Sequence, residues 1–353
     1  MLTADVSSNV DKRRVESAHR LVVGRMLAKN MDPTRIDVLT ILGSGLNGYA
    51  KNCLTGVGDS GVVEIPFNDI WAEVNVTGRA SNVKGHDRTL VIGQIKGDSC
   101  EDLVMALAGR EHMYEDIPAD RAAFFVRLGQ RFGVKAAIIS NAAGIVTPKT
   151  LSPLDIMLVH AHLEQDSSGV LRGGHVPGWG TRFPHMGDLY SARLRKFAQE
   201  KAAELGFMLV NGVYVRKLGP QYEQPIEVYQ LRKEIRLIYE EARLQAEETN
   251  FSDEPTCGVG MSSTPEALSA QDASQAFDQE LVGTIPQYPA YGEGILMLTA
   301  LTNYAAGLGP NGFVAPPTHP EVQENGRLMA SKFEPLVTGI IERLRAERDT
   351  KSA

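Results

Sequence analysis

The sequence predicts an α/β fold in which a central mixed or largely parallel β-sheet is flanked by helices, and two observations predict it. Short apolar runs rich in branched residues end in glycine or polar turns, which is typical of buried strands, although such runs also occur in helices. Segments with helical periodicity lie between these runs, and this alternation favours a layered α/β architecture. The runs that we predict to be strands cover residues 38–42, 90–95, 136–139, 208–215 and 295–301.

Two helices can be placed by their apolar spacing. After Tyr190, apolar residues recur at helical spacing as far as Leu205, and Gly206 is a helix stop signal. Near the C-terminal end, Thr318 and Glu321 have the spacing of a capping box, in which the threonine caps the first turn and the glutamate reaches back to it. The apolar residues that follow trace one helix face: Val322, Met329, Phe333, Leu336, Ile340 and Leu344.

The composition is that of one ordinary globular domain. The chain has 353 residues, of which 43% are hydrophobic and 22% charged. No repeat, low-complexity block or linker-like stretch divides it. We therefore expect a single domain over residues 31–347, preceded by a polar segment and helix over 1–30 and followed by a short tail over 348–353.

Charge and cysteine usage exclude several classes of function. The net charge of −7 does not favour nucleic acid or an acidic membrane surface as a partner. Cys53, Cys100 and Cys257 lie far apart and lack metal-type spacing, so reduced structural thiols are the preferred interpretation. Residues 1–16 lack the apolar core of a signal peptide, and no apolar run is long enough to span a bilayer. We expect a soluble, cytoplasmic protein.

Unusual polar residues lie at or just after four of the predicted strands. These segments are 43–45, 141–144, 219–223 and 302–303. Sites in α/β sheets form at the carboxyl ends of strands, so this convergence is the first indication of a functional site.

The segment 43–48 reads Gly-Ser-Gly-Leu-Asn-Gly and formally matches the dinucleotide fingerprint GxGxxG. Glycines allow backbone amides to approach a phosphate, and the Ser44 hydroxyl adds a donor. A tight strand-to-helix turn is the plain alternative. The fingerprint also requires a following helix, and residues 49–61 are rich in glycine, asparagine and aspartate, which form helices poorly. A dinucleotide-binding oxidoreductase is thus a rival interpretation that rests on this motif alone.

Arg110, His112 and Tyr114 follow the apolar stretch 103–108 at alternate positions. In an extended segment these side chains point to the same side, and arginine offers a planar fork to an oxyanion. An exposed loop with ordinary polar residues is the alternative. His86 precedes another predicted strand, and a lone histidine is more often structural or exposed than functional.

Glu223 and Asn303 have the chemistry to bind a purine base. A buried carboxylate needs a donor, and the N1–H group of a purine is one. An asparagine amide both donates and accepts, which suits a base edge. A surface glutamate and a turn asparagine are the alternatives. The small residues 141–144 expose backbone amides to a ligand, unless they form a plain turn.

In their order along the chain, these segments resemble the trimeric purine nucleoside phosphorylases, the family that also includes methylthioadenosine phosphorylases. The resemblance spans about residues 36 to 340. The matching stretches are ILGSGL, VEIPFNDI, GH, AGREHMYE, SNAAG, SPLDIMLVHAH, RFPHMGDLYS, YVRKLGPQYE, GVGMSSTPEA, ALTNYAAGL and THPEV. So many ordered blocks outweigh the alternatives to each motif, and they imply a nucleoside phosphorylase-like fold over residues 31–347.

The resemblance implies a role for each matching position. Phosphate would be held by Ser44, His86, Arg110, His112, the backbone amide of Ala142, and Ser262. The ribose would be held by Tyr114 and Met261, with His319 at its 5′-hydroxyl, and the base by Tyr222, Glu223 and Asn303. The catalytic groups would be Glu223, Asn303 and His86.

Trp179 stands where the family has a phenylalanine that reaches into the site of a neighbouring subunit. The resemblance therefore implies a homotrimer in which Trp179 lies near the neighbour's ribose site. It implies a purine nucleoside and inorganic phosphate as binding partners, with no metal and no organic cofactor, since phosphate is itself the nucleophile. No nucleic acid or membrane is expected to bind, and the implied role is cytoplasmic purine salvage.

The implied activity is phosphorolysis of a purine nucleoside to the free base and (deoxy)ribose 1-phosphate. Asparagine at position 303 favours 6-oxopurines such as inosine and guanosine, because an amide can donate to O6 whereas a carboxylate would repel it. An S-methyl-5′-thioadenosine phosphorylase, which needs an acidic group near that position, is one alternative. A catalytically silent nucleoside-binding homologue is another.

The chain also departs from the family pattern. Residues 224–256 and 267–294 are longer than usual, and the second includes the sequence Gln-Tyr-Pro-Ala-Tyr at 287–291. Ile145 replaces a usual glycine, and Ala161 a usual aspartate. These departures bear on the substrate preference, the shape near the base and the assembly, but none removes an expected catalytic residue.

Overall fold

A mixed sheet of ten strands forms the centre of the computed structural model, which describes residues 3–43, 46, 48–76, 87–98, 100–245, 255–276 and 290–352. The strands are β1 (Ile36–Leu42), β2 (Leu54–Thr55), β3 (Val63–Pro66), β4 (Thr89–Ile95), β5 (Leu103–Ala108), β6 (Ala136–Ile145), β7 (Ile156–Glu164), β8 (Val210–Arg216), β9 (Cys257–Gly260) and β10 (Gly294–Tyr304). A separate hairpin joins β11 (Leu308–Gly309) to β12 (Gly312–Phe313).

One end of the sheet closes on itself and the other stays open. The strand order is β10-β7-β8-β9-β6-β1-β5-β4-β2, with β3 paired to β4, and β10 also pairs with β6. The strands β6, β9, β8, β7 and β10 therefore form a ring. In the open part, β1 runs parallel to β5 and β6, whereas β4 runs antiparallel to β5. This mixed pairing confirms the predicted sheet.

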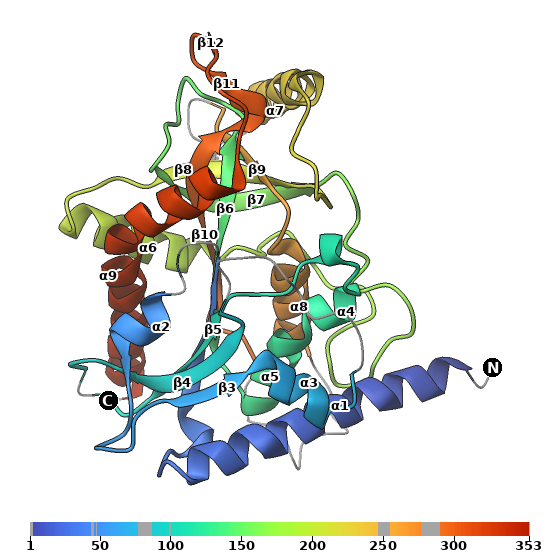
Figure 1. Cartoon of the computed structure of the whole chain (residues 1–353), viewed down its shortest axis with the longest axis vertical. Helices are drawn as coiled ribbons and strands as arrows, with labels where there is room; N and C mark the ends of the chain where they lie inside the picture. The colour runs from blue at the N-terminus through green and yellow to red at the C-terminus, as the bar shows by residue number, and fades with distance from the viewer. Residues whose placement is uncertain are drawn as a thin grey trace.

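Helices cover both faces of the sheet. They are α1 (Thr3–Leu27), α2 (Gly48–Cys53), α3 (Phe67–Glu73), α4 (Ala119–Ala122), α5 (Phe124–Phe132), α6 (Ala192–Glu204), α7 (Pro225–Gln245), α8 (Thr264–Ser274) and α9 (His319–Ser352). In Figure 1, α2, α6 and α9 lie on one side of the sheet and α1, α3, α5 and α8 on the other. The layers are thus helix, sheet and helix, as the sequence predicts.

Alternation along the strands supplies an apolar surface to each helical layer. In β1, Leu39 and Ile41 belong to the core cluster of α1, α3, α5 and α8, whereas Val38 and Leu42 belong to that of α2, α6 and α9. Successive strand residues point to opposite faces, so one run of apolar residues serves both layers. Each fully buried side chain of this size contributes about 1.5–3 kcal/mol. The strand is therefore fixed by packing on both sides.

All five predicted strands are confirmed, but two are longer than expected, since the run predicted over 295–301 also continues, as β10, to Tyr304. The run predicted over 136–139 continues as β6 to Ile145, so residues 141–144 lie within a strand and do not form a turn after it. The reason is tertiary: β10 pairs along this whole stretch, and β9 pairs with Gly144 and Ile145. The pairing partners lie far away in sequence, which hides them from local reasoning.

The two predicted helices are also confirmed. Helix α6 begins after Ser191, whose side chain accepts a hydrogen bond from the Leu194 amide. Helix α9 begins at His319, and the Thr318 hydroxyl accepts from the Glu321 amide at 3.3 Å. Helix α9 buries Met329, Phe333, Leu336, Ile340 and Leu344 in the core, as the periodicity predicts.

Residues near both ends of the described chain pack on the domain. In α1, Val15, Ala18 and Val22 are buried in the main core cluster. Residues 348–352, expected as a tail, continue α9, and the Arg348 guanidinium lies 3.4 Å from the Glu293 carboxylate and also pairs with Asp37. The described ends are therefore parts of the folded domain.

Candidate active site

A cavity of about 390 Å³ opens at the carboxyl ends of six strands of the sheet. Its walls come from the segments that end or follow β1, β5, β6, β8, β9 and β10. Ten of the predicted site residues line it: Arg110, His112, Tyr114, Ala142, Tyr222, Glu223, Met261, Ser262, Asn303 and His319. The polar strand ends that the sequence singles out thus converge on one site, as expected for an α/β sheet.

Arg110 is the buried cation of this cavity. Only 3% of the residue is exposed. Its guanidinium donates to the backbone carbonyls of Ile41 and Ser140 and to the Ser263 hydroxyl, and it pairs with Glu266 at 3.3 Å. Its buried Nε–H group has no hydrogen-bond partner among the described residues. The guanidinium is therefore fixed in place with one donor left over, which suits an oxyanion.

His112 and Tyr114 lie beside Arg110, but not through an extended backbone. Residues 113–115 form a single 3-10 turn, because the Glu115 carboxylate accepts from the His112 amide at 3.3 Å. The two rings stack with centroids 4.7 Å apart. The expected extended segment is thus wrong beyond His112, although all three side chains still line the cavity. Burial lowers the pKa of His112, and nearby Glu115 opposes the shift. The neutral imidazole is therefore favoured.

Ser263 is a residue of this site that the sequence analysis missed. It is fully buried, and its backbone has a φ of +76°, a left-handed conformation that is uncommon outside glycine. Its hydroxyl contacts the Arg110 guanidinium and the Asn141 side-chain amide, the latter at 3.0 Å. Its position between Ser262 and Glu266 in the matched GVGMSSTPEA block was the available signal.

At the proposed base-binding end, Glu223 and Asn303 are both buried, with 7% and 3% exposed. Burial raises the pKa of the Glu223 carboxyl, and Lys217 partly offsets this shift. The Asn303 amide accepts from the Thr302 hydroxyl at 3.0 Å and donates to the Tyr304 carbonyl at 3.2 Å. Its orientation is therefore set by its neighbours, and Glu223 is a carboxylate that lacks a strong cationic partner.

Two glycines make room for these side chains. A β-carbon on Gly219, which has a φ of +80°, would lie 2.5 Å from the Met261 sulfur and 3.4 Å from the Tyr114 ring. A β-carbon on Gly144 would lie 3.3 Å from the Asn303 amide nitrogen. The loop before Glu223 can therefore approach the proposed ribose-binding residues only because position 219 has no side chain.

Of the three other predicted site residues, only Trp179 can be placed, and it does not line this cavity. Ser44 and His86 lie outside the described residues. Trp179 lines a second cavity, where its ring is covered by the Arg127 guanidinium at 5.0 Å. His319 lines the first cavity but is largely exposed at the start of α9.

Glu111, between Arg110 and His112, points away from the first cavity. It is 5% exposed and binds Arg121 at 2.7 and 2.6 Å, and its carboxylate also accepts from the Trp71 indole at 3.1 Å. Burial raises the pKa of this carboxyl, which Arg121 opposes. No local sequence pattern indicates this cluster, because Trp71, Glu111 and Arg121 belong to different segments that only the fold brings together.

The described residues contain neither a metal-binding cluster nor a membrane-spanning helix. Among them, no group of three or more histidines, cysteines, aspartates or glutamates is arranged to hold a metal ion. No helix in the described part of the chain is long and apolar enough to cross a membrane.

Comparison with known proteins agrees with the geometry of the site. The family model of the Phosphorylase superfamily matches residues 63–342 of this chain. Purine nucleoside phosphorylase 1 of Geobacillus stearothermophilus is 30% identical over 316 residues, which are 90% of this chain and 94% of that protein.

Two solved structures are also similar. Schistosoma mansoni purine nucleoside phosphorylase in complex with inosine aligns with a TM-score of 0.68 and 26% identity over 94% of this chain and 96% of that one. The same organism's enzyme in complex with adenosine aligns with a TM-score of 0.69 and 25% identity over 94% and 97%. The chain therefore belongs to the purine nucleoside phosphorylase family, the pentosyltransferases of the phosphorylase superfamily.

Proposed function

We propose that the chain catalyses phosphorolysis of 6-oxopurine nucleosides and deoxynucleosides, such as inosine and guanosine, to the free base and (deoxy)ribose 1-phosphate. The observation that best supports this is a single cavity of about 390 Å³ lined by a buried arginine and by a buried glutamate and asparagine. A cation for phosphate and a carboxylate–amide pair for a purine edge are the two recognition elements that the reaction requires.

Phosphate binds at Arg110. The unpaired Nε–H group of Arg110, the His112 ring, the Ser262 hydroxyl and the backbone amide of Ala142 supply donors around one oxyanion, and these residues line the cavity together. Ser44 and His86 complete the phosphate site by analogy with the family. The Glu266 and Ser263 contacts hold the guanidinium before phosphate arrives, so little reorganisation opposes binding.

The sugar passes through an oxocarbenium-like state as the C1′–N9 bond breaks. Tyr114 and Met261 pack on the ribose, and His319 contacts its 5′-hydroxyl. Phosphate then attacks C1′ and takes the sugar, while the bonding electrons leave with the purine. Catalysis is mainly positioning and electrostatic stabilisation, and no metal or organic cofactor is required.

Glu223 and Asn303 stabilise the leaving base, and Tyr222 packs beside it. Glu223 accepts from N1–H, and from the 2-amino group of guanine. Asn303 donates to N7 or O6 as negative charge builds on the purine, which is why an asparagine there favours 6-oxopurines over adenine. The Schistosoma relative has been solved with adenosine as well as with inosine, so base preference has to be measured for this chain.

The active assembly is a homotrimer in which Trp179 approaches the ribose of a neighbouring subunit, and the enzyme acts in cytoplasmic purine salvage. The support for the trimer is the family resemblance, together with the position of Trp179 in a loop outside its own chain's catalytic cavity. The lengthened segments include α7 and residues 267–274 at the end of α8.

The test is release of base from inosine, guanosine, adenosine and methylthioadenosine, each with and without phosphate. Phosphate-dependent cleavage of inosine and guanosine supports the proposal. Preference for adenosine or methylthioadenosine would keep the reaction class but overturn the role of Asn303. A folded protein that cleaves none of them would favour the silent nucleoside-binding alternative.

A further inference from the structure

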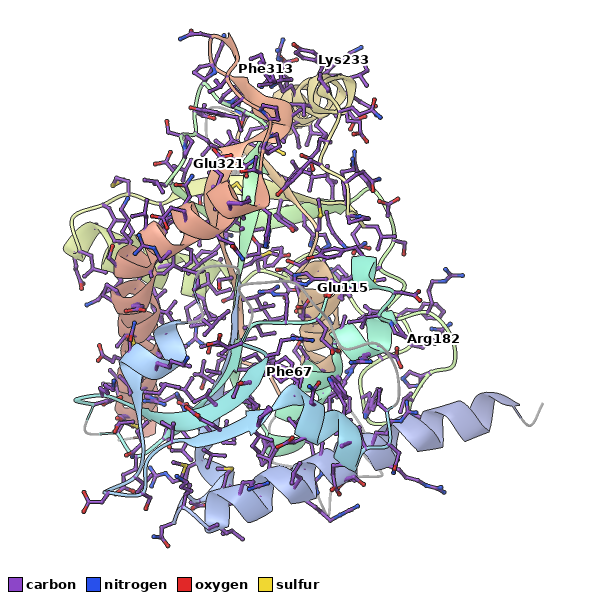
Figure 2. The ribbon with its side chains drawn as sticks, viewed as in Figure 1. Phe67, Glu115, Arg182, Lys233, Phe313 and Glu321 are labelled. Atoms are coloured by element: carbon purple, nitrogen blue, oxygen red, sulfur yellow. The ribbon has the colours of Figure 1, made fainter. Side chains whose placement is uncertain are left out.

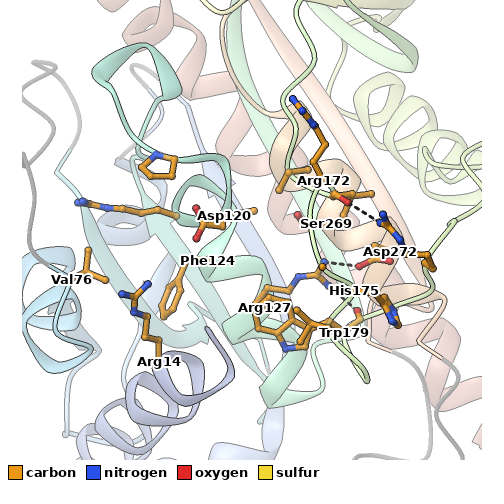
Figure 3. A pocket seen from close by; sticks show the side chains of 18 of the residues that line it. Arg14, Val76, Asp120, Phe124, Arg127, Arg172, His175, Trp179, Ser269 and Asp272 are labelled. Carbon is orange, nitrogen blue, oxygen red and sulfur yellow. Dashed lines mark hydrogen bonds and ion pairs between the residues drawn. The ribbon is translucent and has the colours of Figure 1, made fainter. Parts of the chain in front are cut away.

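We propose that a second cavity, separate from the catalytic one, binds an organic anion that contains a planar ring, of the nucleoside monophosphate class. This cavity has a volume of about 360 Å³, within the range of small-molecule sites. Figure 3 shows it between Phe124 and Asp120 on one side and Arg127, Trp179 and Asp272 on the other. It shares no lining residue with the catalytic cavity among the described residues.

The cavity is positively charged although the whole chain has a net charge of −7. Its lining includes five arginines and two aspartates: Arg14, Arg121, Arg127, Arg172 and Arg182 with Asp120 and Asp272. Arg127 pairs with Asp272 and Arg121 pairs with Glu111, each at 2.6 Å, so the positive charge that remains for a ligand lies mainly on Arg172 and Arg182. A concave positive site in a negative protein attracts anions selectively.

Arg172 and Arg182 are the cations available to a ligand. Both are exposed at the cavity, and Arg182 extends outward from the edge of the molecule in Figure 2. Arg182 donates to the Leu171 carbonyl at 3.4 Å and lies over the Phe183 ring, and neither contact neutralises it. No carboxylate among the described residues forms an ion pair with Arg172 or Arg182, so both retain full charge for an incoming anion.

Buried hydroxyls in the lining point to a polar ligand. Ser269 is fully buried, and its hydroxyl has no hydrogen-bond partner among the described residues. The buried hydroxyl of Thr181 likewise has none there. Both residues line the cavity, and Figure 3 shows Ser269 above the Arg127–Asp272 pair. Buried polar atoms in folded proteins are nearly always paired, so two such hydroxyls at one cavity indicate a place for ligand oxygen or nitrogen atoms.

Aromatic side chains supply the flat walls that a ring requires. Trp71, Phe124 and Trp179 line the cavity. Arg121 lies 4.7 Å from the Trp71 ring centre and Arg127 lies 5.0 Å from that of Trp179, so cations hold both indoles in place. A purine-sized ring packs against such surfaces while its phosphate meets the arginines at the opening.

Trp71 and Trp179 are the only two tryptophans in the chain. Because Trp179 is also proposed to approach the neighbour's ribose, the titration uses a Trp179→Phe protein, in which Trp71 is the fluorescent reporter of this cavity. The probe is inosine 5′-monophosphate, titrated with the catalytic cavity kept saturated by hypoxanthine and phosphate. The proposal predicts a saturable fluorescence change. It also predicts that inosine, which lacks the anion, and phosphate, which lacks the ring, bind about tenfold more weakly or worse.

The deciding variant is Arg172→Ala with Arg182→Ala, two exposed positions whose loss does not threaten the fold. We expect the Kd of the nucleotide to rise about tenfold or more. The matched control is Arg20→Ala with Arg327→Ala, two exposed arginines outside both cavities, which should keep the Kd of the Trp179→Phe protein. Thr181→Val removes one hydroxyl without changing volume and should weaken binding a few-fold.

Three results would overturn the proposal. They are the absence of a saturable change in the Trp179→Phe protein, an equal Kd in the cavity and control variants, and binding of phosphate alone as tightly as the nucleotide.

Discussion

The two cavities hold their arginines in opposite ways. In the catalytic cavity Arg110 is buried and bound by backbone carbonyls, a serine and a glutamate. In the second cavity Arg172 and Arg182 are exposed, and no ion pair fixes either one within the described residues. A cation that must stabilise a transition state benefits from being fixed beforehand, whereas one that only binds a ligand can adapt to it. Substitutions should therefore act sharply in the first cavity and gradually in the second.

The largest effect is expected at Arg110. Arg110→Lys keeps a positive charge beside Glu266 but loses the planar fork, so kcat/KM for phosphate should fall roughly 100- to 1000-fold with the fold intact. Steady-state kinetics at saturating inosine measure this. Arg20→Lys, on the exposed face of α1, is the control and should match the natural chain. A loss of less than about tenfold at Arg110 would mean that its fixed geometry is unimportant.

Next in size is Glu223→Ala, which removes the acceptor for the purine N1–H group. Turnover of inosine should fall about 100-fold while circular dichroism shows a native fold. Glu240→Ala, on the exposed side of α7, is the control. Undiminished turnover in a folded variant would remove Glu223 from the mechanism.

Asn303→Asp tests whether Asn303 sets the preference for 6-oxopurines over adenine. Because an aspartate accepts from the 6-amino group of adenine and repels a 6-oxo group, the ratio of kcat/KM for inosine to that for adenosine should fall about tenfold or more. Both nucleosides are measured side by side in the two proteins. An unchanged ratio would count against this assignment.

A smaller effect is expected from Glu111→Gln, in the wall between the two cavities. Gln keeps a hydrogen bond to Trp71 but loses the ion pair with Arg121, so the unfolding free energy should fall by about 1–3 kcal/mol. The KM for phosphate should rise only a few-fold, since the Glu111 side chain points toward Trp71 and Arg121 and does not line the catalytic cavity. Glu101→Gln, an exposed partner of Arg35, is the control in urea denaturation. A loss of activity as large as that of Arg110→Lys would show that the Glu111 cluster and the catalytic cavity cannot be altered independently.

The smallest effect concerns pH and stability. Burial raises the pKa of Glu223 in the folded chain, so the folded state holds its proton more tightly than the unfolded state does. The stability of the protein therefore falls as pH rises from the unfolded pKa through the higher folded one. Glu223→Gln removes this penalty, so its stability relative to the natural chain should rise as pH increases from the unfolded pKa of glutamate through the higher folded one. A difference that does not change with pH would contradict the buried, weakly paired carboxylate.

Features set by local sequence were predictable, and those set by distant contacts were not. The strands followed from short apolar runs, and α9 from its periodicity and from Thr318. The continuation of β6 through residues 141–144 depends on pairing with β9 and β10, and the turn at Tyr114 depends on the Glu115 carboxylate. Neither contact leaves a local signature.

The same distinction applies to the sites. Residues of the catalytic cavity lie in compact motifs at strand ends, so Arg110, Glu223 and Asn303 could be named from their own chemistry, whereas residues such as Met261 and His319 were named only through the family resemblance. Ser263 and Glu266 act through Arg110, and only their distance from it in the fold reveals this. The second cavity draws its residues from α1, α3, α4, α5, α8 and one long loop, and its members share no motif.

The alternation at positions 110–112 has a consequence for protein engineering. Arg110 and His112 line the catalytic cavity, whereas Glu111 binds Trp71 and Arg121, which line the other. The backbone of residues 110–112 therefore separates the two cavities. A mutant library directed at the second cavity can therefore randomise Trp71, Glu111 and Arg121 as one unit while Arg110 and His112 are kept.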